Sequence, residues 1–176
     1  GCFACVRVGG CQIRDDMALI CERMRRADGF LVGAAVRNGF FPALYKRFLE
    51  RITYDLGFGR ELRGKQLLAV GAVGMATGRK ALRDVLTMKG FQTRVVDYLF
   101  FRVGIPTRRR VEDVRADLDR AGDEFHRALV ERRPLSVGAR LLARVDDWVV
   151  RKFMWERNPG GVYDHMIKRW REKGLM

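Results

Sequence analysis

Three of the four cysteines in this chain stand close together, at Cys2, Cys5 and Cys11. Thiolates that are near in sequence can converge on one centre, as tetrahedral zinc and iron–sulfur clusters require. Cys2 and Cys5 have the C-x-x-C spacing of metal and redox sites, although three thiols are one short of a closed four-ligand site. Two interpretations stay open: a metal or cluster site formed by Cys2, Cys5 and Cys11, or free thiols packed in a loop.

The residues around these cysteines indicate the cellular compartment. Gly1-Cys2-Phe3 is neither a start methionine nor a signal peptide, so we expect a chain cut at its amino end and a cytoplasmic location. In a reducing compartment, crowded cysteines indicate metal binding or redox chemistry before a disulfide framework. Cys21 differs, because it shares helical spacing with Met17, Ile20 and Met24, which predicts a buried apolar residue.

The hydrophobic pattern predicts the elements that position these thiols. Residues 1–13 are expected to form a cysteine-rich loop that turns at Gly9-Gly10, because glycine lets the backbone fold back tightly. Near-continuous apolar runs beginning at Phe30 and Lys65 indicate parallel strands that are buried on both faces. The predicted strands are about residues 30–36, 65–73 and 93–103, and the predicted helices about 16–27, 42–51, 81–89, 111–132, 135–156 and 161–173.

Strands that alternate with helices predict an α/β fold, with a parallel sheet and helices on both faces. Three strands are few for a doubly wound sheet, where about five are usual, so we expect the missing amino-terminal strands upstream of Gly1. From Val111 onward the pattern is wholly helical. We therefore predict an α/β domain over residues 1–108 and a helical carboxyl-terminal extension over residues 109–176.

The charge of the chain bears on its partners. The 176 residues include 35 Lys and Arg against 21 Asp and Glu, and the net charge of +14 attracts nucleic acid, anionic membranes and phosphorylated ligands alike. Because the arginines are scattered in short clusters, nucleic acid is not the expected partner. The carboxyl-terminal helices carry apolar residues among arginines, and we favour packing within the domain or a homo-oligomer over a membrane surface for that face. His126 and His165 have no partner at metal spacing and are expected at a surface or interface.

The amino-terminal motif resembles one protein family. Cys2 to Met17 reads CFAC, five residues and then C-x-I-x-D-D-M, which is similar to the cysteine loop of the flavodoxin-like NADPH-dependent FMN reductases, including their iron–sulfur flavoprotein branch. In that branch a further cysteine stands three positions before the one matching Cys2, and that position would precede Gly1. The resemblance therefore implies an iron–sulfur cluster on Cys2, Cys5 and Cys11 with its fourth ligand upstream, although other relatives keep part of the loop without a cluster.

The resemblance continues past Ala27-Asp28-Gly29 into two loops. In the family, the loop after this strand wraps the isoalloxazine ring with backbone groups and an aromatic side chain, and the loop after the next strand also contacts flavin. Arg37 replaces the family's Tyr here, and Phe40 or Phe41 is available to supply the aromatic face. The residues that the resemblance implies for FMN binding are Ala35, Val36, Arg37, Asn38, Gly39, Gly74, Met75, Thr77 and Gly78.

A member of this family is expected to be an FMN-dependent oxidoreductase that transfers electrons from NAD(P)H or a reduced carrier to a quinone, flavin or other acceptor. The flavin performs the redox chemistry, so we predict no catalytic side chain. The partner would be a small-molecule or protein electron acceptor. Two alternatives stay open: a non-enzymatic iron–sulfur or metal-binding electron-transfer module, and a flavin-free basic interaction protein on the same fold.

Overall fold

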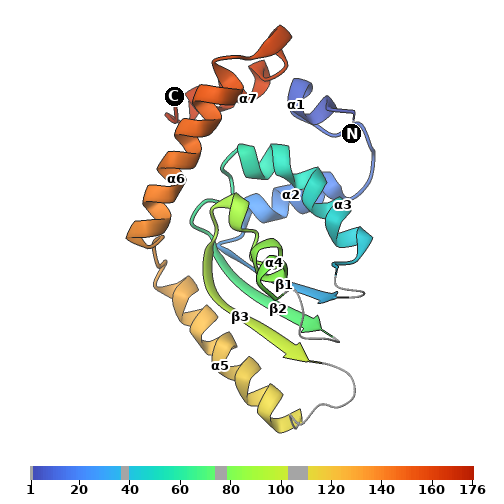
Figure 1. Ribbon diagram of the computed structural model, residues 1–176, viewed down its shortest axis with the longest axis vertical. Coiled ribbons are helices and arrows are strands. Elements are labelled where there is room, and N and C mark those ends of the chain that lie inside the picture. The colour runs from blue at the N-terminus through green and yellow to red at the C-terminus, as the bar shows by residue number, and fades with distance from the viewer. Residues whose placement is uncertain (1, 37–39, 74–78, 103–110) are drawn as a thin grey trace.

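A computed structural model describes residues 2–36, 40–73, 79–102 and 111–176 (Figure 1). Its centre is a parallel sheet in the order β1-β2-β3, formed by β1 (Gly29–Val36), β2 (Gln66–Val73) and β3 (Arg94–Arg102). β2 lies in the middle and is buried over most of its length, because it pairs with a strand on each side. The three predicted strands are confirmed to within one residue at each end.

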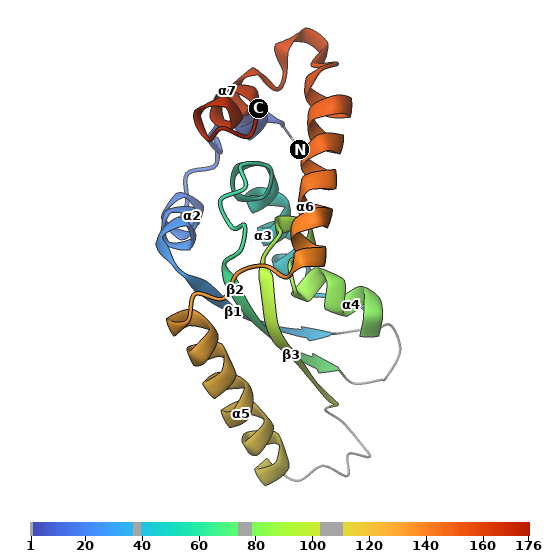
Figure 2. The same cartoon turned by 90° about the vertical axis from the view of Figure 1, so that its left-hand side faces the viewer.

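Helices cover both faces of this sheet, which confirms the predicted α/β class. One face carries α2 (Met17–Arg26), α3 (Ala43–Ile52) and α4 (Arg79–Leu86), and the other carries α5 (Val111–Val130) (Figures 1 and 2). α3 continues as a π-helical segment, η1 (Thr53–Phe58), and a single 3-10 turn, η2 (Lys89–Phe91), precedes β3.

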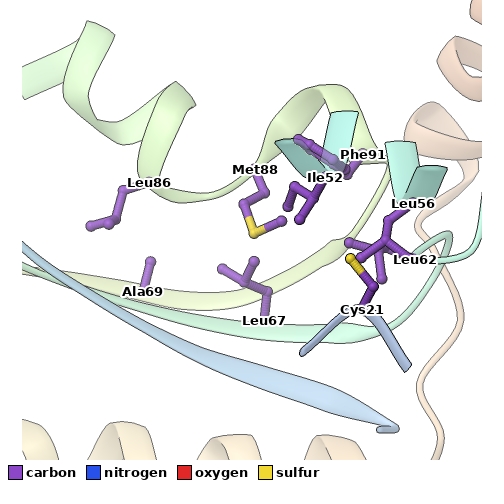
Figure 3. Packing of buried hydrophobic residues seen from close by; sticks show 9 residues of the cluster. All are labelled: Cys21, Ile52, Leu56, Leu62, Leu67, Ala69, Leu86, Met88 and Phe91. Carbon is purple, nitrogen blue, oxygen red and sulfur yellow. The ribbon is translucent and has the colours of Figure 1, made fainter. Parts of the chain in front are cut away.

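The main core lies between the sheet and the helices α2, α3 and α4 (Figure 3). Side chains from β2, such as Leu67, meet Ile52 and Leu56 from α3 and η1 and Leu86 from α4. All four are fully buried, and each such aliphatic side chain contributes roughly 1.5–3 kcal/mol by leaving water. This packing fixes the orientation of α2 and α3 relative to the strands, and those two helices carry most of the candidate site.

β1 differs from the prediction that it is buried on both faces. Phe30, Val32 and Ala34 pack toward the core, but Leu31 on the opposite face is 66% exposed. The reason is that β1 pairs only with β2 in the described part of the chain, and α5 lies over β2 and β3 rather than over β1. An apolar run of this kind cannot distinguish a central strand from an edge strand.

The amino-terminal segment also differs from the predicted loop. Residues Ala4–Val8 form a short helix, α1, which ends at Gly9 in the left-handed conformation with φ of 75°. A helix this short is unstable alone, but Ala4 and Val6 are buried in the folded protein. Tertiary packing therefore makes a helix where the glycines and cysteines indicated a loop.

The carboxyl-terminal residues form α6 (Val137–Val149), η3 (Val150–Trp155), η4 (Pro159–Gly161) and α7 (Asp164–Glu172). Val150, Trp155, Met166 and Trp170 make a second, smaller core that brings α7 back against η3. α7 also packs on α1, so that the first and last helices lie together at one end of the molecule (Figure 1). The division at residues 108 and 109 stays a prediction, with α5 packed on the sheet and α7 on α1.

Candidate functional site

Three cysteines from different segments line one cavity of about 230 Å³, which we call the cysteine pocket. Cys5 comes from α1, Cys11 from the connection to α2, and Cys21 from α2 itself. Arg25, Arg51 and Asp55 complete its charged walls. The pocket therefore combines thiols with cations, the setting in which cysteines bind metals or take part in redox chemistry.

The structure brings together two of the three predicted ligands. Cys5 and Cys11 line the cysteine pocket, whereas Cys2 is exposed and does not line it. Within the described ranges, no group of three His, Cys, Asp or Glu side chains is arranged to hold a metal ion. A site formed by Cys2, Cys5 and Cys11 with a further ligand upstream therefore stays a prediction.

Cys21 is the pocket residue that sequence reasoning assigned only to the core. Its burial is confirmed, since it is 7% exposed and packs in the main core. It also faces the cysteine pocket, together with Met17 and Arg25 on the same side of α2. Met17, Cys21 and Arg25 are four residues apart, which places them on one face of the helix. This spacing was the sequence feature that could have predicted that Cys21 faces the same pocket as Arg25.

Arg51, at the end of α3, links the cysteine pocket to its surroundings. Its guanidinium donates to both carboxylate oxygens of Asp15, at 2.5 and 2.9 Å, and Nη2 also donates to Sγ of Cys11 at 3.4 Å. These hydrogen bonds hold the pKa of Asp15 below its ordinary value. Because the guanidinium fork is planar and always charged, it fixes Cys11 against α3 and presents positive charge to the sulfur.

Burial disfavours the ionised form of two thiols in the cysteine pocket. Burial raises the pKa of Cys5, and the nearby Cys11 adds to that shift. Burial also raises the pKa of Cys21, with a further contribution from Asp55. Since the thiolate is the reactive form, these raised pKa values lower the reactivity of Cys5 and Cys21 at neutral pH.

α7 holds the cysteine helix in place. A side chain added at Gly9 would collide with the imidazole of His165, at 2.0 Å from Nε2, so the two residues are in direct contact. This confirms that His165 lies at an interface, formed by α1 and α7. On the same side, Phe3 meets Tyr54 of η1 edge to face, with 6.1 Å between ring centroids.

A network of charges ties α7 to the wall of the cysteine pocket. Arg169 donates to Asp55 at 2.7 Å and to Glu61 at 2.6 Å, and Arg25 from α2 pairs with the other oxygen of Asp55. Asp55 lines the pocket and is mostly shielded from solvent. The same carboxylate therefore orders α2, η1 and α7 around the thiols.

A second cavity of about 640 Å³ lies beside the carboxyl-terminal half of β1, and we call it the strand-end pocket. β1 contributes Gly33, Ala34 and Ala35, while α2 and α3 contribute apolar walls that include Tyr45 and Phe48. Burial raises the pKa of Tyr45 to about 12, so its hydroxyl stays neutral. The size and apolar lining are those of a cavity for a small organic ligand.

The strand-end pocket includes one of the predicted flavin-binding residues. Ala35 lines it, and Val36 is half-buried at the end of β1. Phe41 packs against Tyr45, with 5.2 Å between ring centroids, whereas Phe40 is 76% exposed and is the aromatic residue free to cover a ligand. The remaining predicted residues lie outside the described residues: Arg37, Asn38, Gly39, Gly74, Met75, Thr77 and Gly78.

The two pockets are adjacent. Met17 of α2 and Arg51 of α3 line both pockets. These two side chains therefore form a shared wall between the thiols and the strand-end pocket. A parallel α/β protein with a ligand-sized cavity beside the carboxyl end of a strand has the architecture of a nucleotide- or flavin-binding protein.

Comparison with known proteins defines the family. The model of the NADPH-dependent FMN reductase family matches residues 2–102, which run from the first cysteine to the end of β3. The chain therefore belongs to the NADPH-dependent FMN reductase family, and the predicted fold, an α/β flavodoxin-like sheet, is confirmed.

Individual relatives match shorter stretches. An iron–sulfur flavoprotein of Methanocaldococcus jannaschii is 38% identical over 74 residues, covering 41% of this chain and 38% of the relative. The iron–sulfur flavoprotein of Methanosarcina thermophila is 46% identical over 50 residues, covering 28% of this chain and 26% of the relative. The chain thus matches well under half the length of these curated relatives. General stress protein 14 of Treponema denticola, solved in complex with FMN, is 18% identical with a TM-score of 0.44, covering 69% of this chain and 76% of that one.

Proposed function

We propose that this chain binds FMN and acts as an oxidoreductase. It would transfer electrons from NAD(P)H or a reduced carrier to a quinone, flavin or other acceptor. The observation that carries the proposal is the family match, which spans the whole sheet and both pockets. When bound, FMN supplies the electron-transfer chemistry, and the protein supplies orientation and electrostatics.

The strand-end pocket fits part of such a ligand. Its apolar walls suit the faces of a planar ring, and Phe40 stands exposed just beyond the end of β1. Arg47 and Arg51 are the cations in its walls. Arg51 is paired with Asp15, so Arg47 is the cation that suits a phosphate group or a reduced, anionic ring. The seven predicted flavin residues outside the described ranges remain part of this proposal.

A flavin titration tests the proposal. The purified chain, mixed with FMN, is expected to quench flavin fluorescence, and Ala35→Glu is expected to weaken binding by at least about tenfold by placing a carboxylate in an apolar wall. Val130→Glu, on the exposed end of α5 and far from either pocket, is the matched control. A protein that leaves FMN fluorescence unchanged would contradict flavin binding, and oxidation of NADPH with a quinone acceptor then tests the reaction itself.

A second candidate is an iron–sulfur or other metal-binding electron-transfer module. The name of the two curated relatives favours it, together with the shared pocket of Cys5 and Cys11. Against it stands Cys2, which lies outside that pocket in the described structure. Iron and labile sulfide are measured after anaerobic reconstitution in the wild type and in Cys2→Ala, which lacks one predicted ligand. If both proteins lack iron and sulfide, a cluster on these cysteines is contradicted.

A further inference from the structure

A stripe of exposed apolar side chains runs along α6 and η3. Leu142 is 67% exposed and Trp148 is 50% exposed, and their neighbours at helical spacing are similar. In both views α6 lies along the outside of the molecule (Figures 1 and 2). The outer stripe consists of Val137, Leu141, Leu142, Val145, Trp148, Val149 and Phe153.

The opposite side of α6 faces the body of the protein, and it holds both acidic residues of the helix. Asp146 accepts a hydrogen bond from Arg60 at 2.6 Å, and Asp147 accepts from Arg60 at 2.9 Å and from Arg63 at 2.6 Å. Ala143 and Val150 are the buried residues on this inner side. Both carboxylates are therefore paired with arginines of the body, Asp147 mostly shielded from solvent and Asp146 still 48% exposed.

Basic residues flank the outer stripe. Arg140, Arg144 and Arg151 are exposed, and their spacing of four and seven residues places them along one side of the helix. The outward surface of α6 thus presents Leu, Val, Trp and Phe bordered by arginine. This is the composition of helices that lie in the plane of a membrane surface, with the apolar side in the acyl boundary and the cations at the headgroups.

We propose that α6 and η3 bind an anionic lipid surface, with the outer stripe inserted and Arg140, Arg144 and Arg151 at the headgroups. Charge decides between this occupant and a second copy of the chain. Two copies packed through this surface would bring together two chains that each carry a net charge of +14. An anionic surface instead complements the exposed arginines along this helix. The helix would lie on the membrane, because no helix in the described ranges is long and apolar enough to cross one.

Vesicle binding tests the proposal. The chain is mixed with vesicles of phosphatidylcholine, with or without phosphatidylglycerol, and the bound fraction is measured by sedimentation. Binding is expected only with the anionic lipid, and it should fall steeply as salt is raised. Replacing the three arginines by glutamine is expected to weaken binding by roughly a hundredfold, since each basic residue near an anionic leaflet strengthens binding severalfold.

Two controls separate this surface from charge in general and from misfolding. Glutamine at Arg26, Arg120 and Arg127, all exposed on other helices, lowers the net charge equally and should change binding by less than about threefold. Leu142→Gln with Val145→Gln should abolish binding, whereas Leu118→Gln with Val130→Gln on α5 should not. Far-ultraviolet circular dichroism confirms that each variant is folded.

Trp148 supplies a direct reading of insertion. It is the exposed tryptophan, since Trp155 and Trp170 are 4% and 0% exposed. Its emission should shift to the blue on anionic vesicles, and Trp148→Phe should remove the shift while keeping binding. Absence of vesicle binding by a folded chain overturns the proposal. A dimer in sedimentation equilibrium that Leu142→Gln dissociates also overturns it, in favour of a second copy.

Discussion

The two pockets are built in different ways. Every residue that lines the strand-end pocket lies between Asp15 and Arg51, within one β1-centred unit. The cysteine pocket is lined by residues from Cys5 to Asp55, and its α1 wall is held in place by α7. One pocket therefore depends on neighbouring elements, and the other depends on contacts that span almost the whole chain.

Their chemical character differs as well. The strand-end pocket has mostly apolar walls, so its contribution to binding is area and shape. The cysteine pocket is bounded by paired charges, such as Arg51 with Asp15 and Arg169 with Asp55. A network of partly buried ion pairs keeps its geometry only while every member is present. A substitution in this network can therefore expose the thiols to solvent without contacting them.

The largest effect is expected from removing the anchor of α7. Trp170 is fully buried, and its Nε1 donates to the carbonyl of Phe58 at 2.6 Å. Trp170→Ala should lower the free energy of unfolding by about 3–5 kcal/mol, because it empties the second core. Urea denaturation measures the loss, and the comparison predicts that Cys21 becomes accessible while FMN binding in the strand-end pocket is retained.

Trp148→Ala is the matched control for this change. Because Trp148 is half exposed, its loss should cost less than about 1 kcal/mol. If the two substitutions lowered the free energy of unfolding equally, Trp170 would not be the anchor of α7. The proposed dependence of the cysteine pocket on α7 would then be contradicted.

A smaller effect is expected from Glu61, which accepts hydrogen bonds from Arg169 and Lys173. Burial opposes its ionisation, but the two cations outweigh burial and hold the pKa of Glu61 below 4.5, its ordinary value. A lowered pKa in the folded state means that Glu61 stabilises the protein above about pH 4.5 and loses this effect as pH falls through the folded pKa.

Glu61→Gln should therefore cost about 1–3 kcal/mol at pH 7 and flatten the loss of stability in acid. Denaturation midpoints measured from about pH 3 to about pH 7, a span that includes 4.5, the ordinary pKa of Glu61, give both results. Glu156→Gln is the control, because its ion pair with Lys152 is about half exposed and should contribute less than about 1 kcal/mol. If Glu61→Gln lost stability in acid as steeply as the wild type, the stabilising role of Glu61 in the charge network would be contradicted.

The smallest effect concerns the thiols themselves. Cys2 and Cys11 are exposed, whereas Cys21 is buried with a raised pKa. Iodoacetamide should modify Cys21 at least about tenfold more slowly than Cys2 at pH 8, as read by mass spectrometry of the peptides. The rate at Cys21 should still rise above pH 9.0, the ordinary thiol pKa. Equal rates at the two cysteines in the folded protein would mean that the cysteine pocket is open.

The sequence was informative where structure follows from local pattern. The strands appear where apolar runs indicated them, and α2, α3 and α4 begin within two residues of the predicted positions. The cysteine motif also identified the family, which the match over residues 2–102 confirms. These successes share a cause, because periodicity and motif spacing are properties of short segments.

What the sequence could not reveal depends on partners far along the chain. α1 is helical because it packs on α7 and η1 with Val6 buried, and nothing within residues 1–13 encodes those contacts. The exposure of Leu31 depends on where α5 lies. The inward direction of Asp146 and Asp147 depends on Arg60, more than eighty residues earlier. Such contacts are set by tertiary packing, which local propensity does not determine.

The contact between Gly9 and His165 also bears on biosynthesis. A ribosome delivers α1 long before α7, and domains acquire their long-range contacts only after the participating segments have emerged. During translation the cysteine helix therefore lacks the partner that fixes it, and its thiols are exposed to solvent until α7 has emerged. Enclosure of these thiols therefore follows the emergence of α7, more than 150 residues after α1.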